Sequence, residues 1–135
     1  MLKSIEGNFD NPEVNELLTK HFVELRAASP EGSAHVLDIS GLKVPSIKFW
    51  SLWDNEKLIG CGALKFLDKE HGEFKSIRIH DNFRMQGQGV NVINHLINEA
   101  KKLKIKRLSI ETGASDFFIR ARKLFIKTGF TVCEP

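Results

Sequence analysis

The chain has 135 residues, of which 41% are hydrophobic and 27% are charged, and its formal net charge is +3. This length fits one domain, residues 1–135, which buries enough surface to fold without disulfide bonds or bound metal. No apolar run approaches the roughly 20 residues that cross a bilayer, and the first residues lack the apolar stretch of a signal peptide. We therefore expect no membrane association and a cytoplasmic location.

The cysteines and histidines give no sign of a metal site. Cys61 and Cys133 lie far apart and form no CxxC pair, so we expect small buried thiols in a reducing compartment, with one disulfide as the alternative. His35 and His71 have no metal-ligand spacing with each other or with either cysteine. The basic run 101–107 lies at a helix end, where the dipole favours cations, and lacks interleaved aromatic residues. We therefore expect neither a metal nor a nucleic-acid partner.

The first elements in chain order are a strand, a helix and an irregular connection. Residues 2–6 alternate weakly and predict a strand. Asn11 and Pro12 give a helix start, with Asn11 as its cap. The helix has one apolar face, formed by Val14, Leu17, Leu18, His21, Phe22 and Leu25. Segment 27–46 is rich in Gly, Pro and Ser, so we expect an irregular connection with one helical turn at 34–37, of the kind that often contacts substrate.

Three strands follow, at 47–53, 57–67 and 73–80. The turns between them, 54–56 and 68–72, are short enough for antiparallel hairpins. Gly60 and Gly62 interrupt the middle strand, as is typical of a β-bulge.

The second half of the chain changes to helical spacing. One helix carries Ile93, Leu96, Ile97, Ala100 and Leu103, and a strand at 105–111 follows it. The next helix is capped by Ser115 or Asp116 and ends at Gly129. Its apolar side consists of Phe117, Ala121, Leu124, Phe125 and Thr128, and a last strand occupies 130–133. Hairpins followed by a strand–helix–strand–helix–strand unit predict an α/β fold with a mixed, mostly antiparallel sheet flanked by helices.

The segment Arg84-Met85-Gln86-Gly87-Gln88-Gly89-Val90 joins a strand to a helix and has the properties of a phosphate-binding turn. A helix N-terminus offers free N–H groups and the positive end of the dipole. Gly87 and Gly89 let the backbone approach a phosphate without an intervening Cβ, and Arg84 can neutralise part of its charge.

Three phosphate-binding patterns compete for this turn. The P-loop string G-x-x-x-x-G-K-[ST] is absent. The dinucleotide fingerprint G-x-G-x-x-G begins at Gly87 but meets Val92 where its third glycine belongs, although Glu111 lies at a suitable spacing for a ribose contact. An oxidoreductase is therefore one alternative. The third pattern, Arg-x-x-Gly-x-Gly after a strand, fits completely.

Arg84 to Gly89 resembles the acetyl-CoA signature of the GNAT superfamily of N-acetyltransferases. Segment 121–130, Ala-Arg-Lys-Leu-Phe-Ile-Lys-Thr-Gly-Phe, is similar to the family's A-x-x-L-Y-x-x-x-G-F helix ending. The resemblance covers about residues 47–133. It implies a GNAT-like acyl-CoA N-acyltransferase fold. It also implies direct transfer of an acetyl group from acetyl-CoA to a primary amine of a small molecule or peptide.

The resemblance also implies where the co-substrate lies. Family members splay two strands apart and hold the pantetheine arm between them, and the matching strands here are 73–80 and 106–111. Backbone groups of Ile77, Arg78 and Ile79 would contact the pantetheine. Backbone amides from the turn would hold the pyrophosphate, namely those of Met85, Gln86, Gly87, Gln88, Gly89 and Val90.

The reaction needs a proton acceptor, because an amine is mostly an ammonium ion near neutral pH. Glu73 is the first candidate, since family members often carry a carboxylate on this strand. His80 and Glu111, at strand ends beside the same cleft, are the alternatives.

The chain departs from the family pattern in three places. Phe125 replaces a tyrosine that protonates the CoA thiolate in many relatives, and the chain contains no tyrosine. A thiol with a pKa of roughly 8.5 still leaves without a strong acid, but a non-catalytic acyl-CoA-binding or regulatory module becomes the alternative function. Phe118 replaces an asparagine that commonly contacts CoA. Finally, relatives carry one more strand after 130–133, so we expect that strand to be missing or supplied by a second copy in a homodimer.

Overall fold

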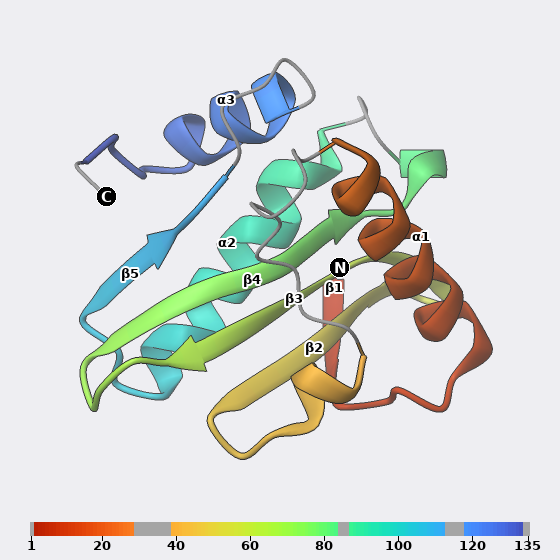
Figure 1. Cartoon of the computed structure of the whole chain (residues 1–135), viewed down its shortest axis with the longest axis horizontal. Coiled ribbons are helices and arrows are strands. Elements are labelled where there is room, and N and C mark those ends of the chain that lie inside the picture. Colours follow the sequence, from red (N-terminus) through yellow and green to blue (C-terminus); the bar gives the residue numbers. More distant parts are fainter. Residues whose placement is uncertain (1, 29–38, 84–86, 113–117, 134–135) are drawn as a thin grey trace.

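The computed structural model describes residues 2–28, 39–83, 87–112 and 118–133 (Figure 1). Its elements follow one another as β1 (Leu2–Glu6), α1 (Pro12–Ala28), the 3-10 helix η1 (Ser40–Lys43), β2 (Ile47–Asp54), β3 (Lys57–Phe66), β4 (His71–Ile79), the 3-10 helix η2 (Asp81–Phe83), α2 (Gln88–Lys102), β5 (Arg107–Ile110) and α3 (Ile119–Lys127). The predicted order of strands and helices is confirmed up to α3. The helical turn expected at 34–37 and the cap at Ser115 or Asp116 fall outside the described residues.

The described strands form a single sheet in the order β1-β2-β3-β4-β5. Neighbours from β1 to β4 run antiparallel, and β4 and β5 run parallel. Figure 1 shows α1 in front of this sheet and α2 behind it. The mixed, mostly antiparallel sheet with flanking helices confirms the predicted fold class. It does not fit a dinucleotide-binding oxidoreductase, whose sheet is mostly parallel.

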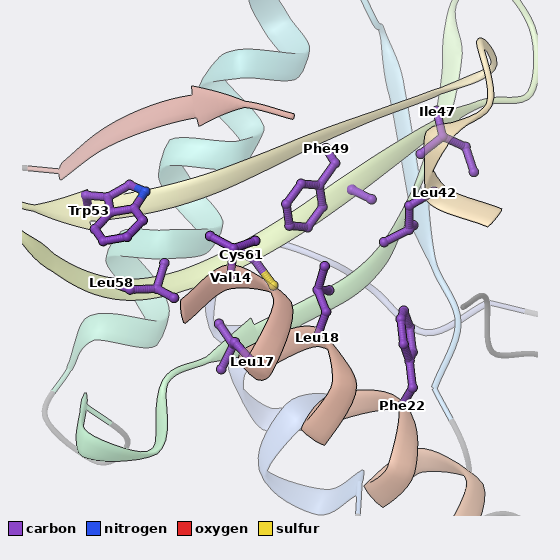
Figure 2. Packing of buried hydrophobic residues seen from close by; sticks show 11 residues of the cluster. Val14, Leu17, Leu18, Phe22, Leu42, Ile47, Phe49, Trp53, Leu58 and Cys61 are labelled. Carbon is purple, nitrogen blue, oxygen red and sulfur yellow. The ribbon is translucent and has the colours of Figure 1, made fainter. Parts of the chain in front are cut away.

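The core has one hydrophobic cluster on each face of the sheet, because successive side chains of a strand point to opposite faces. On the α1 face, Figure 2 shows α1 side chains meeting those of β2 and β3; this cluster includes Val14, Leu17, Leu18, Phe22, Phe49, Trp53, Leu58 and Cys61. On the α2 face the cluster includes Trp50, Leu52, Ile59, Leu64, Phe74, Val92, Leu96 and Ala100. The helical spacing predicted for both helices is confirmed, and their buried faces fix them on opposite sides of the sheet.

Local hydrogen bonds set the start of α1 and of β4. The Asn11 side-chain oxygen accepts the N–H of Glu13 at 2.9 Å, which confirms the predicted cap. Asp68 Oδ1 accepts the N–H groups of Glu70 and His71, both at 2.8 Å. These bonds close the turn early, so β4 begins at His71 rather than at residue 73.

Two further details differ from the prediction. β5 spans 107–110 instead of 105–111, because the Ile105 N–H donates to the Ala100 carbonyl at the end of α2, at 3.2 Å. The 3-10 helix η1 lies in the segment that was expected to be irregular. It forms where Leu42 becomes buried against the α1-face cluster.

The strand predicted at 130–133 is wrong, because residues 130–133 have no regular secondary structure. The Phe130 N–H donates to the Phe125 carbonyl at 3.0 Å and so belongs to the end of α3. Gly129 has φ of +112°, which confirms the predicted glycine cap. Beyond it Val132 is 88% exposed, and Cys133 is exposed rather than buried as expected. Both cysteines are free, so the alternative of a disulfide is also wrong.

Candidate active site

The parallel pairing of β4 with β5 ends before β4 does. The register runs from His71–Arg107 to Phe74–Ile110, whereas β4 continues to Ile79. Within the described residues, β4 therefore has an edge from Lys75 to Ile79 that β5 does not cover. We call this stretch the free edge of β4, and it matches the splayed strands expected from the sequence.

A β-bulge shapes the free edge. Cys61 pairs with Arg78 and Ala63 pairs with Lys75, so β4 contains one more residue than β3 between these pairs. Ser76 lies in the bulge with φ of +56°. The irregularity faces the Gly60–Gly62 stretch of β3, where the sequence predicted a bulge. A bulge bends its strand and re-aims the residues beyond it.

Backbone direction beyond the bulge distinguishes the three residues expected to contact pantetheine. The His80 N–H donates to the Ile59 carbonyl of β3 at 2.7 Å. Because backbone groups of successive strand residues point to opposite edges, Ile79 faces the free edge and Arg78 faces β3. The Arg78 carbonyl lies 2.5 Å from where a Cβ on Gly60 would be. This register favours Ile77 and Ile79 over Arg78 for backbone contacts at the free edge.

The N-terminus of α2 follows the free edge in the chain. Gly87 precedes the helix in the left-handed region with φ of +78°, which favours glycine, and α2 begins at Gln88. Gln88 is partly exposed, and its Oε1 accepts a hydrogen bond from Asn91 Nδ2 at 3.2 Å. The first N–H groups of any α-helix have no partner within the helix, so this end offers donors to an anion. Arg84, Met85 and Gln86 lie outside the described residues.

The close packing of α2 against α3 explains why position 89 is a glycine. A Cβ at Gly89 would lie 2.8 Å from a methyl group of Leu124, so its absence lets α2 and α3 approach closely. Among the described residues, no atom beyond the chain neighbours of Gly87 lies within 4 Å of the corresponding position on Gly87. Gly87 is therefore explained by its backbone conformation and Gly89 by the contact between helices, where the sequence had offered one explanation for both.

Glu73 lies where β4 and β5 part. Its Oε1 is 2.9 Å from Lys75 Nζ, and the two side chains are only 20% and 23% exposed. Across the sheet Glu73 pairs with Ser109, whose Oγ is 2.9 Å from His71 Nε2. These side chains lie on the face opposite to Phe74, which packs with α2. They therefore lie on the sheet face that also carries α1.

The two alternative bases lie at different points along β4. Glu111 directly follows the last pair of β5 and is exposed, so it is near the point where the strands part. His80 follows β4 at its other end, roughly 20 Å from Glu73 at about 3.3 Å per strand residue. There its Nδ1 accepts the Asn82 N–H at 3.2 Å, and its ring meets that of Phe83. The structure places Glu73 and Glu111 near the point where the strands part and His80 away from both.

Phe125 lies in an aromatic chain rather than at an open surface. It is 8% exposed, its ring centroid is 6.0 Å from that of Phe130, and Phe130 is 6.3 Å from Phe74. These three rings pack α3 against Phe74, the last residue of β4 that pairs with β5. Phe118 is partly buried and immediately precedes α3.

A group of charged residues that the sequence did not reveal surrounds Arg78. The Arg78 guanidinium is buried and forms ion pairs with Glu24 of α1 and Asp81 of η2. Asp81 also pairs with Lys20 of α1. The partners on α1 are more than fifty residues away in the chain, so no local pattern links them. Only the spacing of Arg78 and Asp81, three residues apart, could have been noticed beforehand.

Cys61 packs beside this group, and its thiol donates one hydrogen bond to the β4 bulge. Its thiol is fully buried, and burial raises its pKa to about 12, partly countered by the Arg78 charge. The Sγ atom lies 3.4 Å from the Ser76 carbonyl in the bulge. A thiol with this pKa stays protonated at neutral pH and is a poor nucleophile.

Within the described ranges, no three His, Cys, Asp or Glu side chains are grouped to hold a metal ion. A helix long and apolar enough to cross a membrane is likewise not found among them.

Comparisons with known proteins agree with this geometry. The model of the acetyltransferase (GNAT) family matches residues 12–130. The uncharacterized N-acetyltransferase YsnE from Bacillus subtilis (strain 168) is 43% identical over 123 residues, which cover 91% of this chain and 82% of YsnE. The family match therefore includes α1, strands β2 to β5, α2 and α3.

Solved structures share the fold. The Bacillus subtilis protein YycN, a proposed acetyltransferase, superposes with a TM-score of 0.78 at 20% identity, covering 100% of this chain and 95% of YycN. A GNAT family acetyltransferase from Elizabethkingia anophelis with acetyl-CoA bound has a TM-score of 0.69 at 22% identity, covering 98% and 78%. The chain belongs to the GNAT family of acetyltransferases, and its reaction is the transfer of an acetyl group from acetyl-CoA to an amine.

Proposed function

We propose that acetyl-CoA binds with its pyrophosphate at the N-terminus of α2 and its pantetheine arm along the free edge of β4. The observation that carries this placement is that β4 continues from Lys75 to Ile79 without β5. The outward-facing N–H and C=O groups that β5 leaves unpaired there suit the amides of a pantetheine arm, as an added strand would. The Elizabethkingia relative binds acetyl-CoA on a similar fold, which supports the choice of ligand.

This placement selects among the candidate bases. An arm that starts at α2 and runs back along the free edge carries its thioester toward Lys75, where the strands part. Glu73 lies beside that point, whereas His80 lies at the pyrophosphate end. The α2 face of β4 is filled by the hydrophobic cluster around Phe74. The amine therefore approaches from the α1 face, onto which Glu73 projects.

In the proposed reaction Glu73 accepts the proton that the ammonium group of the acceptor must lose. The neutral amine then attacks the thioester carbonyl, a C–N bond forms, and the C–S bond breaks. The sulfur leaves as a thiolate, and the nitrogen loses its second proton as it becomes an amide. Because Phe125 has no proton to donate, water passes this second proton to the thiolate. Glu111, exposed beside the same point, is the second candidate for the base.

Replacement of Gln88 by Glu tests the placement. The new carboxylate keeps the size of the side chain and its acceptor for Asn91. A negative charge in the first turn of a helix stabilises the helix by about 0.3–1 kcal/mol. The same charge repels a pyrophosphate bound there. We expect Gln88→Glu to unfold at a slightly higher temperature and yet to bind acetyl-CoA about ten-fold more weakly by isothermal titration calorimetry.

Asn15→Asp is the matched control, because it places the same charge in the first turn of α1, on an exposed residue. Its affinity for acetyl-CoA should equal that of the unmodified chain. Equal affinities for all three proteins would contradict the placement at α2. A chain that binds acetyl-CoA tightly but releases no thiol with any amine of a broad panel would instead be the non-catalytic module.

A further inference from the structure

The side chain of Arg78 is the most buried charged group of the described residues, with 4% exposure. Its NH1 group donates to Glu24 Oε2 on α1, and its NH2 group donates to Asp81 Oδ1 on η2 at 3.0 Å. Asp81 also accepts a bond from Lys20 on α1. One guanidinium therefore joins the strand β4, the 3-10 helix η2 and the helix α1.

Stability alone does not account for this arrangement. Removing a guanidinium from water is costly, and well-packed apolar side chains often replace a buried ion pair at no loss of stability. The pairing is also incomplete, because Arg78 Nε is buried without a hydrogen-bond partner among the described residues. The ion pair between Lys48 and Glu6 differs, since its side chains are 37% and 58% exposed and carry little desolvation cost.

The position of Arg78 indicates what the guanidinium fixes. Arg78 is flanked by Ile77 and Ile79, whose backbone groups face the free edge of β4. Asp81 belongs to η2, which ends at Phe83, directly before the predicted pyrophosphate turn in the chain. Glu24 belongs to the last turns of α1, on the sheet face from which the amine approaches.

We propose that Arg78 is a positioning residue that holds η2 and α1 in register with the free edge of β4. The pair with Asp81 sets the angle at which the chain leaves β4 for the turn, and so aligns the pyrophosphate site with the pantetheine site. The pair with Glu24 fixes α1 against the strand that carries Glu73, and so shapes the acceptor side. This inference rests on the placement of acetyl-CoA proposed above.

Loss of each ion pair is predicted to change a different constant: the Kd for acetyl-CoA in one case and the KM for the amine in the other. A purely structural role would not produce this difference. Asp81→Asn and Glu24→Gln each remove one charge and keep the size of the side chain and a hydrogen-bond acceptor. We expect Asp81→Asn to raise the Kd for acetyl-CoA about ten-fold. We expect Glu24→Gln to leave that Kd unchanged and to raise the KM for the amine. Glu6→Gln, in the exposed pair with Lys48, should change neither constant.

Arg78→Lys supplies a second variant for the same question. A lysine presents a compact charge in place of the planar fork, so it cannot hold both carboxylates in the same geometry. It should fold, with a Kd for acetyl-CoA between those of the unmodified chain and Asp81→Asn. All affinities are measured by calorimetry at a temperature well below the unfolding transition of each variant.

The proposal is overturned if Asp81→Asn and Arg78→Lys lower the unfolding temperature but bind acetyl-CoA like the unmodified chain. It is also overturned if Asp81→Asn and Glu24→Gln raise both constants by the same factor. The Gln88→Glu variant distinguishes failure of the role proposed for Arg78 from failure of the proposed placement of acetyl-CoA. If Gln88→Glu weakens binding and Asp81→Asn does not, acetyl-CoA binds as proposed and Arg78 does not position its site.

Discussion

Glu73 and Lys75 form a close ion pair at the point where β4 and β5 part, and the two side chains differ in what they offer an amine. The carboxylate can bind the ammonium form of the acceptor and take its proton, whereas the Lys75 ammonium only repels it. The pair therefore holds the carboxylate in one orientation while no acceptor is bound. General bases of this kind contribute roughly 10²–10⁴-fold to a rate.

We predict that Glu73→Gln lowers kcat about 10²-fold or more. The Kd for acetyl-CoA should stay the same, because the pyrophosphate and pantetheine sites proposed above are elsewhere on β4 and α2. The remaining rate should rise with pH as the free amine fraction grows. Steady-state release of thiol between pH 6 and pH 10, with calorimetry for the affinity, provides the measurement.

Lys75→Met is the control for loss of the ion pair itself. It breaks the same contact but retains the carboxylate, so most of the activity should persist. If Glu73→Gln keeps the activity of the unmodified chain, Glu73 is not the base and Glu111 becomes the next residue to replace. Equal losses in both variants would point to the ion pair and not to proton transfer.

The two cysteines allow a prediction about burial. Because the Cys61 pKa is raised from 9.0 to about 12, its neutral thiol stabilises the folded state below pH 9. That contribution is lost as the pH rises from 9 toward 12, since the unfolded chain releases the proton first. The difference in unfolding free energy between the unmodified chain and Cys61→Ala should therefore shrink over this range.

Thiol labelling at pH 8 checks the same burial directly. Cys133, which is exposed, should react quickly with an aromatic disulfide reagent, and Cys61 should react only after denaturant is added. Rapid reaction of both thiols in the native state would show that the region around the β4 bulge opens readily.

At the scale of elements, the sequence was most informative where a single local cause decides the structure. Asn11 and Pro12 start α1, and Gly129 ends α3, through hydrogen bonds within a few residues. The short turns between β2, β3 and β4 allowed only hairpins.

The sequence was least informative where contacts with residues far away in the chain determine the local structure. Residues 130–133 have strand-like composition, but a strand exists only through pairing, and their first N–H caps α3 instead. Arg78 was expected to serve through its backbone, because the extra residue of the bulge and the Glu24 carboxylate on α1 are invisible in a local pattern. Glu73 could be proposed by resemblance, but its place beside the parting strands required the register of β4 with β5.

The bulge region carries a prediction of its own. A Cβ on Gly60 would lie 2.5 Å from the Arg78 carbonyl, a backbone atom that moves only if β4 moves. We expect Gly60→Ala to lower the free energy of unfolding by about 1–3 kcal/mol, as overpacking does. Denaturant titration provides the measurement.

Gly72→Ala is the matched control in the same sheet. Its Cβ would lie 2.6 Å from a methyl group of Leu64, which can rotate away. It should therefore destabilise the chain less than Gly60→Ala. The reverse order would contradict the close approach of β3 to β4 at Arg78.

At the scale of the whole molecule, the two faces of the sheet differ in character. Its α2 face is closed by the hydrophobic cluster that holds α2 in place, and its α1 face presents Glu73 and Lys75. The free edge of β4 lies between these faces. A linear co-substrate along this edge therefore has its anionic end at α2 and its reactive end beside the polar face, where an amine can reach it.

Amide hydrogen exchange, followed by NMR with and without acetyl-CoA, tests this arrangement most directly. The account predicts slower exchange at Ile77, Ile79 and residues 87–90 when acetyl-CoA is added, and no change at these amides with NADH. Saturating binding of acetyl-CoA with unchanged exchange at all of these amides would contradict it.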